Sequence, residues 1–151
     1  MSIVVRLAKK NDMINMLQLL EKANLNTEGL AENLDNFLVV EDVRQSEPYM
    51  VGMVGLEIYG DLGILRSLVL RSESWNSKVG VELLSLIIGY GWKKGLREIY
   101  LMTQISQDFF EYWGFVEVTW DDLPEHLRQS SQFHEYDSRY VTLMRLQKSG
   151  K

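Results

Sequence analysis

The spacing of apolar residues changes at Arg71, and this change constrains the fold more than any other feature of the sequence. Before Arg71, apolar residues occur in short runs rich in β-branched side chains, which is typical of strands. After it, apolar residues recur at helical spacing from Val79 to Tyr90, on one stripe of a helix that ends at Gly95. A strand-rich half followed by alternating helices and strands predicts a mixed α/β sheet.

The first half of the chain predicts four strands and at least one helix. We expect the strands at 3–7, 37–43, 49–59 and 62–71. Asn11 or Asp12 caps a helix in which apolar residues recur from Met13 to Leu20, and 27–33 is a candidate second short helix. Because Gly60-Asp61 suits a tight turn and the other connections are short, these strands should pair antiparallel.

The second half predicts helices that connect further strands. We expect strands at 97–102, 115–118 and 140–146, and helical segments at 107–113 and 123–132. Strands 62–71, 97–102 and 115–118 alternate with helices, and such crossovers imply parallel pairing in this half. The predicted class is therefore an α/β mixed sheet with an antiparallel N-terminal half and a partly parallel C-terminal half. One domain should cover residues 1–151, with a frayed tail at 147–151.

Composition excludes several classes of function. The 16 basic and 21 acidic residues give a net charge of -5, so no basic field is present to hold a nucleic acid. The chain has no cysteine, which excludes disulfides, thiolate zinc sites and a cysteine nucleophile. His126 and His134 are too few and too far apart to predict a metal site. The N-terminus lacks an apolar signal region and no long apolar stretch follows, so we expect a cytoplasmic protein with no membrane partner.

Several segments resemble successive parts of a GNAT N-acetyltransferase domain. They read VRLAKKNDMINMLQLLEKANL, GILRSLVLRSESW, VGVELLSLIIGYGWKKGLREIYLMT and FFEYWGFVEV, and together they cover nearly the whole chain at the spacing of the family. The stretch from Leu101 to Leu146 is similar to the acetyltransferase domain of N-acetylglutamate synthases and to small arsenic-operon-linked acetyltransferases. The resemblance implies a GNAT-type fold, acetyl-CoA or coenzyme A as cofactor, and a small amine as acceptor, with amino acids as one option.

The same resemblance implies where the cofactor lies. The family pattern of Arg or Gln, two residues, Gly, one residue, and Gly or Ala places Trp75, Lys78 and Gly80 at its three defining positions, and only Gly80 fits. Backbone N–H groups at a helix start hold phosphate well, and the strand before the loop should splay from strand 97–102 to admit the pantetheine arm. Otherwise Gly80 is simply a glycine tolerated in a helix start. The predicted cofactor-binding residues are Leu68, Val69, Leu70, Ser77, Lys78, Val79, Gly80 and Val81.

Two charged residues inside apolar strands are candidates for the chemistry. Acyl transfer from a thioester to an amine requires a neutral amine, an oxyanion donor and a proton for the thiolate. Glu57 is the candidate base because it is a lone carboxylate in an apolar strand; alternatively it is paired across the hairpin with Arg66. Arg66 either binds the carboxylate of an amino-acid substrate or serves as the partner of Glu57.

The general acid of the family is missing from its usual position. Many members place a tyrosine four residues before the glycine of the helix-end motif, and here Phe110 stands four residues before Gly114. Tyr112 lies about 200° round the helix from Phe110 and does not substitute for it. Two functions therefore stay open: an active N-acetyltransferase, or a weak or inactive relative that binds acyl-CoA or another ligand as a regulatory or interaction module. A homodimer is one of the open oligomeric states.

Overall fold

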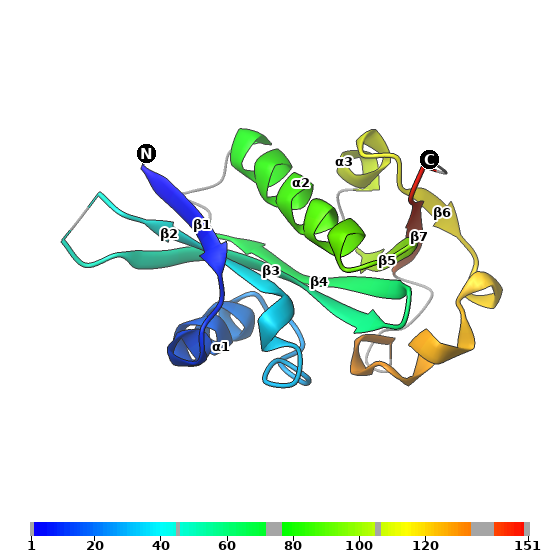
Figure 1. The fold of residues 1–151 in the computed structure, drawn as a ribbon, viewed down its shortest axis with the longest axis horizontal. Helices are drawn as coiled ribbons and strands as arrows, with labels where there is room; N and C mark the ends of the chain where they lie inside the picture. Colours follow the sequence, from blue (N-terminus) through cyan, green and yellow to red (C-terminus); the bar gives the residue numbers. More distant parts are fainter. Residues whose placement is uncertain (1, 45, 72–76, 105–106, 134–140, 150–151) are drawn as a thin grey trace.

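The described part of the protein, in a computed structural model, comprises residues 2–44, 46–71, 77–104, 107–133 and 141–149. Within it, the strands form one seven-stranded sheet of order β1-β2-β3-β4-β5-β7-β6 (Figure 1). All neighbours are antiparallel except β4 and β5, which are parallel. This arrangement confirms the predicted mixed sheet and the parallel pairing of strands 62–71 and 97–102. The parallel pairing expected between strands 97–102 and 115–118 is wrong, because the last strand lies between them and is antiparallel to both. The strands are β1 (Ile3–Leu7), β2 (Phe37–Asp42), β3 (Tyr49–Tyr59), β4 (Leu62–Leu70), β5 (Glu98–Thr103), β6 (Val116–Val118) and β7 (Thr142–Gln147).

Helices cover both faces of the sheet. Helix α1 (Met13–Lys22) lies on one face, and α2 (Ser77–Lys93) and α3 (Gln107–Tyr112) lie on the other (Figure 1). Successive side chains of a strand point to opposite faces, so β2 serves two cores. Phe37 packs in the cluster that α1 covers, whereas Leu38 packs in the cluster that α2 covers. The sheet is therefore apolar on both faces at its centre.

Two predicted helices are wrong because local polar groups and backbone angles interrupt them. In 27–33, Gly29 has a φ of 76° and the Asn26 side chain accepts a hydrogen bond from Glu28 N, so the chain forms turns. In 123–132, two 3-10 helices at Glu125–Gln129 and Ser131–Phe133 are separated by Ser130, which is extended with a ψ of 137°. The first segment consequently forms turns and the second forms short 3-10 helices in place of an α-helix, and both lie beside the candidate site.

The two parallel strands diverge after a short paired stretch. The β4–β5 ladder consists of Leu62 with Glu98, Gly63 with Ile99, and Ile64 with Tyr100. Strand β4 continues to Leu70 and β5 continues to Thr103 without further pairing between them in the described residues. Pairing between the two strands therefore ends at Ile64, as the predicted splay requires.

Candidate functional site

Strand β4 carries a bulge beyond the point where it leaves β5. Arg66 lies opposite Gly55 and Val69 lies opposite Met53, so β4 has one more residue than β3 between the two pairs. Ser67 in this bulge has a φ of 61°, which residues other than glycine adopt infrequently. Leu68, Val69 and Leu70 follow the bulge as half-buried residues along the splayed part of β4. The predicted cofactor-binding residues of this strand thus share the diverging segment.

The other predicted cofactor-binding residues form the beginning of α2. Residues 77–81 occupy its first turn and a half, at the positive end of the helix dipole. Lys78 is exposed and Gly80 is buried. Trp75 and the rest of 72–76 lie outside the described residues. In the described residues, strand β4 is followed by the start of α2, in the predicted order.

Glu57 and Arg66 form a buried ion pair between β3 and β4. Arg66 Nη1 donates to Glu57 Oε2 at 2.8 Å, and the two side chains are 0% and 3% exposed, respectively. Glu57 lies opposite Ile64, the last residue of β4 that pairs with β5. The structure therefore has the pairing of Glu57 with Arg66 that the sequence left as an alternative. The pair is buried rather than exposed on the surface, and it lies where β4 and β5 stop pairing.

Two hydroxyl groups hold the other oxygen of the Glu57 carboxylate. Tyr59 Oη and Ser130 Oγ each donate to Glu57 Oε1 at 2.7 Å. Burial raises the pKa of the Tyr59 phenol to about 12, and the hydrogen bond to the negative Glu57 acts in the same direction. Tyr59 therefore stays protonated at neutral pH and serves as a hydrogen-bond donor.

Arg66 also fastens the loop that follows α1. Its Nη1 donates to the Glu28 carbonyl at 2.6 Å, its Nη2 to the Asn26 carbonyl at 2.9 Å, and its Nε to Ser67 Oγ at 3.0 Å. Asn26 Nδ2 in turn donates to the Ser131 carbonyl at 3.1 Å. One network of hydrogen bonds therefore joins the loop after α1, the two central strands and the segment around residue 130.

A pocket of about 380 Å³ opens over this network. Gly29 lies at its inner wall, and a Cβ at that position would be 3.3 Å from Arg66 Nη1 and 3.8 Å from Glu57 Oε2. Three glutamates, Glu28, Glu32 and the buried Glu57, line the pocket, so it is polar and rich in carboxylates. Its lining residues are Glu28, Gly29, Glu32, Asn33, Glu57, Ile58, Tyr59, Gln129, Ser130 and Ser131.

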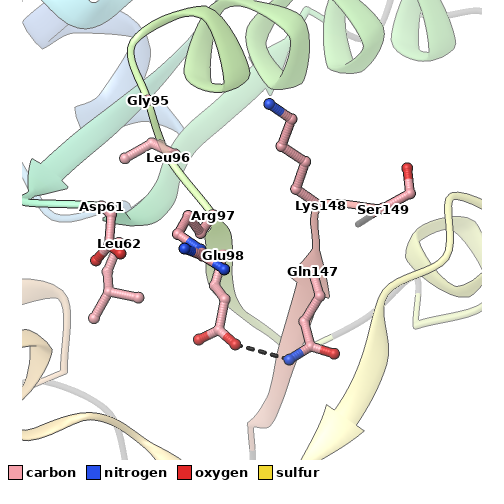
Figure 2. Close-up of a pocket in the computed structure, with 9 residues that line it drawn as sticks. All are labelled: Asp61, Leu62, Gly95, Leu96, Arg97, Glu98, Gln147, Lys148 and Ser149. Carbon is pink, nitrogen blue, oxygen red and sulfur yellow. Dashed lines mark hydrogen bonds between the residues drawn. The ribbon is translucent and has the colours of Figure 1, made fainter. Parts of the chain in front are cut away.

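A larger hollow of about 670 Å³ lies elsewhere, beside the paired ends of β4 and β5 (Figure 2). Glu98 in this hollow accepts hydrogen bonds from Gln147 Nε2 and Tyr100 Oη, both at 2.8 Å. Figure 2 shows Arg97 and Lys148 on opposite sides of the same opening. It adjoins the closed part of the β4–β5 ladder, so the candidate site is the smaller pocket at the splay.

Helix α3 has a buried phenylalanine, Phe110, at the position where many GNAT proteins have a tyrosine. Phe110 is 7% exposed and makes edge-to-face contacts with Phe109 and Phe115, whose ring centroids are 5.3 and 5.8 Å away. Tyr112 is 84% exposed. Phe110, which stands where many GNAT proteins have a tyrosine, is therefore an aromatic core residue.

The sequence did not single out Asn26, Tyr59 or Ser130, which belong to the network, or Gly29, which lines the pocket. Tyr59 had a usable signal, because residues two apart in a strand share a face and it follows Glu57 at that spacing. Ser130 had none, since it is 73 residues from Glu57 in the chain. None of the helices in the described ranges has the length and apolarity that a membrane span requires.

Comparison with known proteins gives a family match and several structural neighbours. Residues 10–115 match the model of the family described as "Acetyltransferase (GNAT) family". The uncharacterized protein YwlB of Bacillus subtilis (strain 168) is 31% identical over 134 residues, which is 87% of this chain and 87% of YwlB. These two matches cover most of the chain, including both central strands and α2.

Solved structures share the fold at lower identity. The N-acetylglutamate synthase of Neisseria gonorrhoeae, complexed with coenzyme A and N-acetyl-glutamate, has a TM-score of 0.78 and 19% identity, over 97% of this chain and 35% of that one. Rv2747 from Mycobacterium tuberculosis, solved in complex with CoA, has a TM-score of 0.75 and 19% identity, over 96% and 99% of the two chains. The chain therefore spans about a third of the length of the gonococcal synthase, and the likeness is one of fold.

Proposed function

The chain belongs to the acetyltransferase (GNAT) family, and we propose that it transfers an acetyl group from acetyl-CoA to the amine of a small molecule. In this reaction the amine nitrogen attacks the thioester carbonyl carbon, the C–S bond breaks, and the coenzyme leaves as a thiolate. The amine loses one proton, which a base accepts, and the thiolate gains one. The observation that carries the proposal is the buried Glu57 carboxylate below a polar pocket at the start of the β4–β5 splay.

The proposed cofactor position follows the splay and the start of α2. Two structural neighbours were solved with coenzyme A, which supports the same ligand for this chain. Leu68, Val69 and Leu70 would line the pantetheine, with a backbone N–H of this segment as donor to the thioester oxygen. The backbone N–H groups of Ser77, Lys78, Val79, Gly80 and Val81 would face the pyrophosphate, where the positive end of the helix dipole favours negative charge.

Glu57 is the proposed base. Among the residues that the structure describes, Oε2 accepts a hydrogen bond from Arg66, and Oε1 accepts one from Tyr59 and one from Ser130. Because Gly29 has no side chain, no Cβ stands beside Oε2, where it would lie 3.8 Å away. Phe110 has no acidic proton, so solvent supplies the proton of the departing thiolate in this proposal.

The acceptor is proposed to be a small-molecule amine, with amino acids as one option. A crystal structure of the gonococcal synthase contains N-acetyl-glutamate, which supports that option. In this chain Arg66 is fully buried and its hydrogen bonds go to the protein, so its position favours the role of partner to Glu57 over that of carboxylate anchor. The carboxylates of Glu28 and Glu32 at the pocket favour an acceptor with positive charge.

A second candidate function is ligand binding without efficient catalysis. Phe110 at the position of the family tyrosine and the exposed Lys78 in the cofactor motif are the observations that favour it. The single-domain organisation, cytoplasmic location and lack of a nucleic-acid partner rest on composition and stay predictions.

Release of free thiol from acetyl-CoA distinguishes the two functions. The purified chain is incubated with acetyl-CoA and a panel of plain alkylamines, polyamines and amino acids. An acetyltransferase releases thiol in proportion to added amine and forms an acetylated product that mass spectrometry detects. A binding module gives calorimetric binding of acetyl-CoA but no amine-dependent thiol.

A further inference from the structure

We propose that Tyr59 relays the proton of the acceptor amine to Glu57. The inference rests on the proposed function, because it needs an amine acceptor and Glu57 as the final base. It assigns to Tyr59 the direct contact with the acceptor.

The relay is needed because Glu57 is almost closed off from solvent. Glu57 is 2% exposed, and three donors already occupy its carboxylate. Tyr59 is only partly buried and lines the same pocket. An amine in the pocket therefore meets the phenol oxygen more readily than the carboxylate below it.

The geometry of β3 suits a relay. Glu57 and Tyr59 are two residues apart and so share a face of the strand, with Tyr59 Oη 2.7 Å from Glu57 Oε1. In the proposed step an N–H proton of the attacking amine moves to Tyr59 Oη while the phenol proton moves to Glu57 Oε1. Tyr59 gains one proton as it gives up another, so the phenol never has to ionise. Its raised pKa disfavours such an ionisation.

Ser130 supplies a matched control for this idea. Its Oγ donates to the same Oε1 atom at the same 2.7 Å, and it also accepts a hydrogen bond from Gln132 N at 3.1 Å. Ser130 also lines the pocket but is only 2% exposed, whereas Tyr59 is partly exposed, so the contact with the acceptor is assigned to Tyr59. Tyr59→Phe and Ser130→Ala each remove one hydrogen bond of 2.7 Å to Glu57 Oε1, and Ser130→Ala also removes the acceptor of Gln132 N. Only Tyr59→Phe removes the relay.

The test compares thiol release from acetyl-CoA in the wild type, Tyr59→Phe, Ser130→Ala and Glu57→Gln, using the alkylamine, polyamine and amino-acid panel. Loss of a proton-transfer group lowers kcat by about 10² to 10⁴, so we expect Tyr59→Phe to lose about 10² or more. We expect Ser130→Ala to lose less than Tyr59→Phe, because it removes a hydrogen bond to the Glu57 carboxylate but no proton-transfer group. The KM for acetyl-CoA should change in neither variant, and thermal unfolding checks that both are folded.

Each outcome has one meaning. Equal losses of kcat in Tyr59→Phe and Ser130→Ala, with Glu57→Gln impaired, overturn the relay and leave the base in place. An active wild type with an unimpaired Glu57→Gln overturns both the base and the relay. A wild type that releases no amine-dependent thiol refutes the proposed function, and the relay with it.

Discussion

Arg66 Nη1 lies 2.8 Å from Glu57 Oε2, and this ion pair ties the proposed base to the loop after α1. The same guanidinium donates to the carbonyls of Asn26 and Glu28. A buried ion pair adds little net stability because both charges lose their hydration, whereas removal of one partner costs about 3–5 kcal/mol. The main role of the ion pair is therefore to fix the position of the Glu57 carboxylate at the pocket.

Replacement of Glu57 by glutamine should remove the base while keeping the shape of the side chain. We expect kcat to fall by about 10² to 10⁴ and the free energy of unfolding to fall as well, because the charge of Arg66 is left unbalanced. Thiol release between about pH 6 and about pH 9, at a temperature well below the Tm of the variant, measures the first effect. A wild-type rate throughout that range would show that Glu57 is not the base.

Replacement of Arg66 by glutamine tests the role of the guanidinium. We expect destabilisation of about 3–5 kcal/mol, measured by denaturant unfolding, since Glu57 loses its buried partner. If the variant retains activity, its KM for amino acids and its KM for plain alkylamines should change by the same factor, because the buried guanidinium does not reach the acceptor. A rise in KM confined to amino acids would instead identify Arg66 as the carboxylate anchor.

Acetyl-CoA should raise the Tm of the protein. A ligand that binds the native state alone stabilises it by about 2.7 kcal/mol at a hundredfold excess over Kd, and each kcal/mol shifts Tm by about 2 to 4 °C in a chain of this size. Lys78→Glu should reduce the shift by placing negative charge near the pyrophosphate, and Lys78→Gly should keep or enlarge it through closer backbone approach. The absence of any shift with acetyl-CoA or coenzyme A, together with silent calorimetry, would contradict the proposed cofactor.

Gly29 should preserve the space beside Arg66 and Glu57 at the pocket, and Gly60 provides the matched comparison. Both have a positive φ, of 76° and 65°, so alanine at either position is expected to cost about 1–2 kcal/mol of stability. A Cβ at Gly29 approaches Arg66 Nη1 within 3.3 Å, whereas a Cβ at Gly60 meets nothing within 4 Å. We therefore expect Gly29→Ala to reduce thiol release much more than Gly60→Ala at a similar Tm. Equal activities in the two variants would place the acceptor elsewhere.

The order and pairing of the central elements could be predicted from the sequence. Strand β3 has the predicted limits at Tyr49 and Tyr59, and the turn that follows has the positive φ expected of Gly60. The parallel pairing of β4 and β5 follows from the helical crossover between them. Such features depend on residues close together in the chain, which is why apolar spacing and turn residues were enough to identify them.

The geometry of the candidate site could not be predicted, because it depends on contacts between residues far apart in the chain. Glu57 and Arg66 were recognised because a charge in an apolar strand is unusual, but their burial depends on the loops that cover them. Those loops were predicted as helices, and their irregular form results from Gly29 and from the extended Ser130.

The sequence alone therefore determined the pairing of β3 with β4 and of β4 with β5, and which charged residues lie in these strands, because these follow from side-chain period and chain connectivity. Only the tertiary structure decided that Ser130 meets Glu57 across 73 residues and that Arg66 is enclosed by the carbonyls of Asn26 and Glu28. The physical reason is that a buried charge takes its partners from whichever backbone and hydroxyl groups the packed loops bring within hydrogen-bond distance.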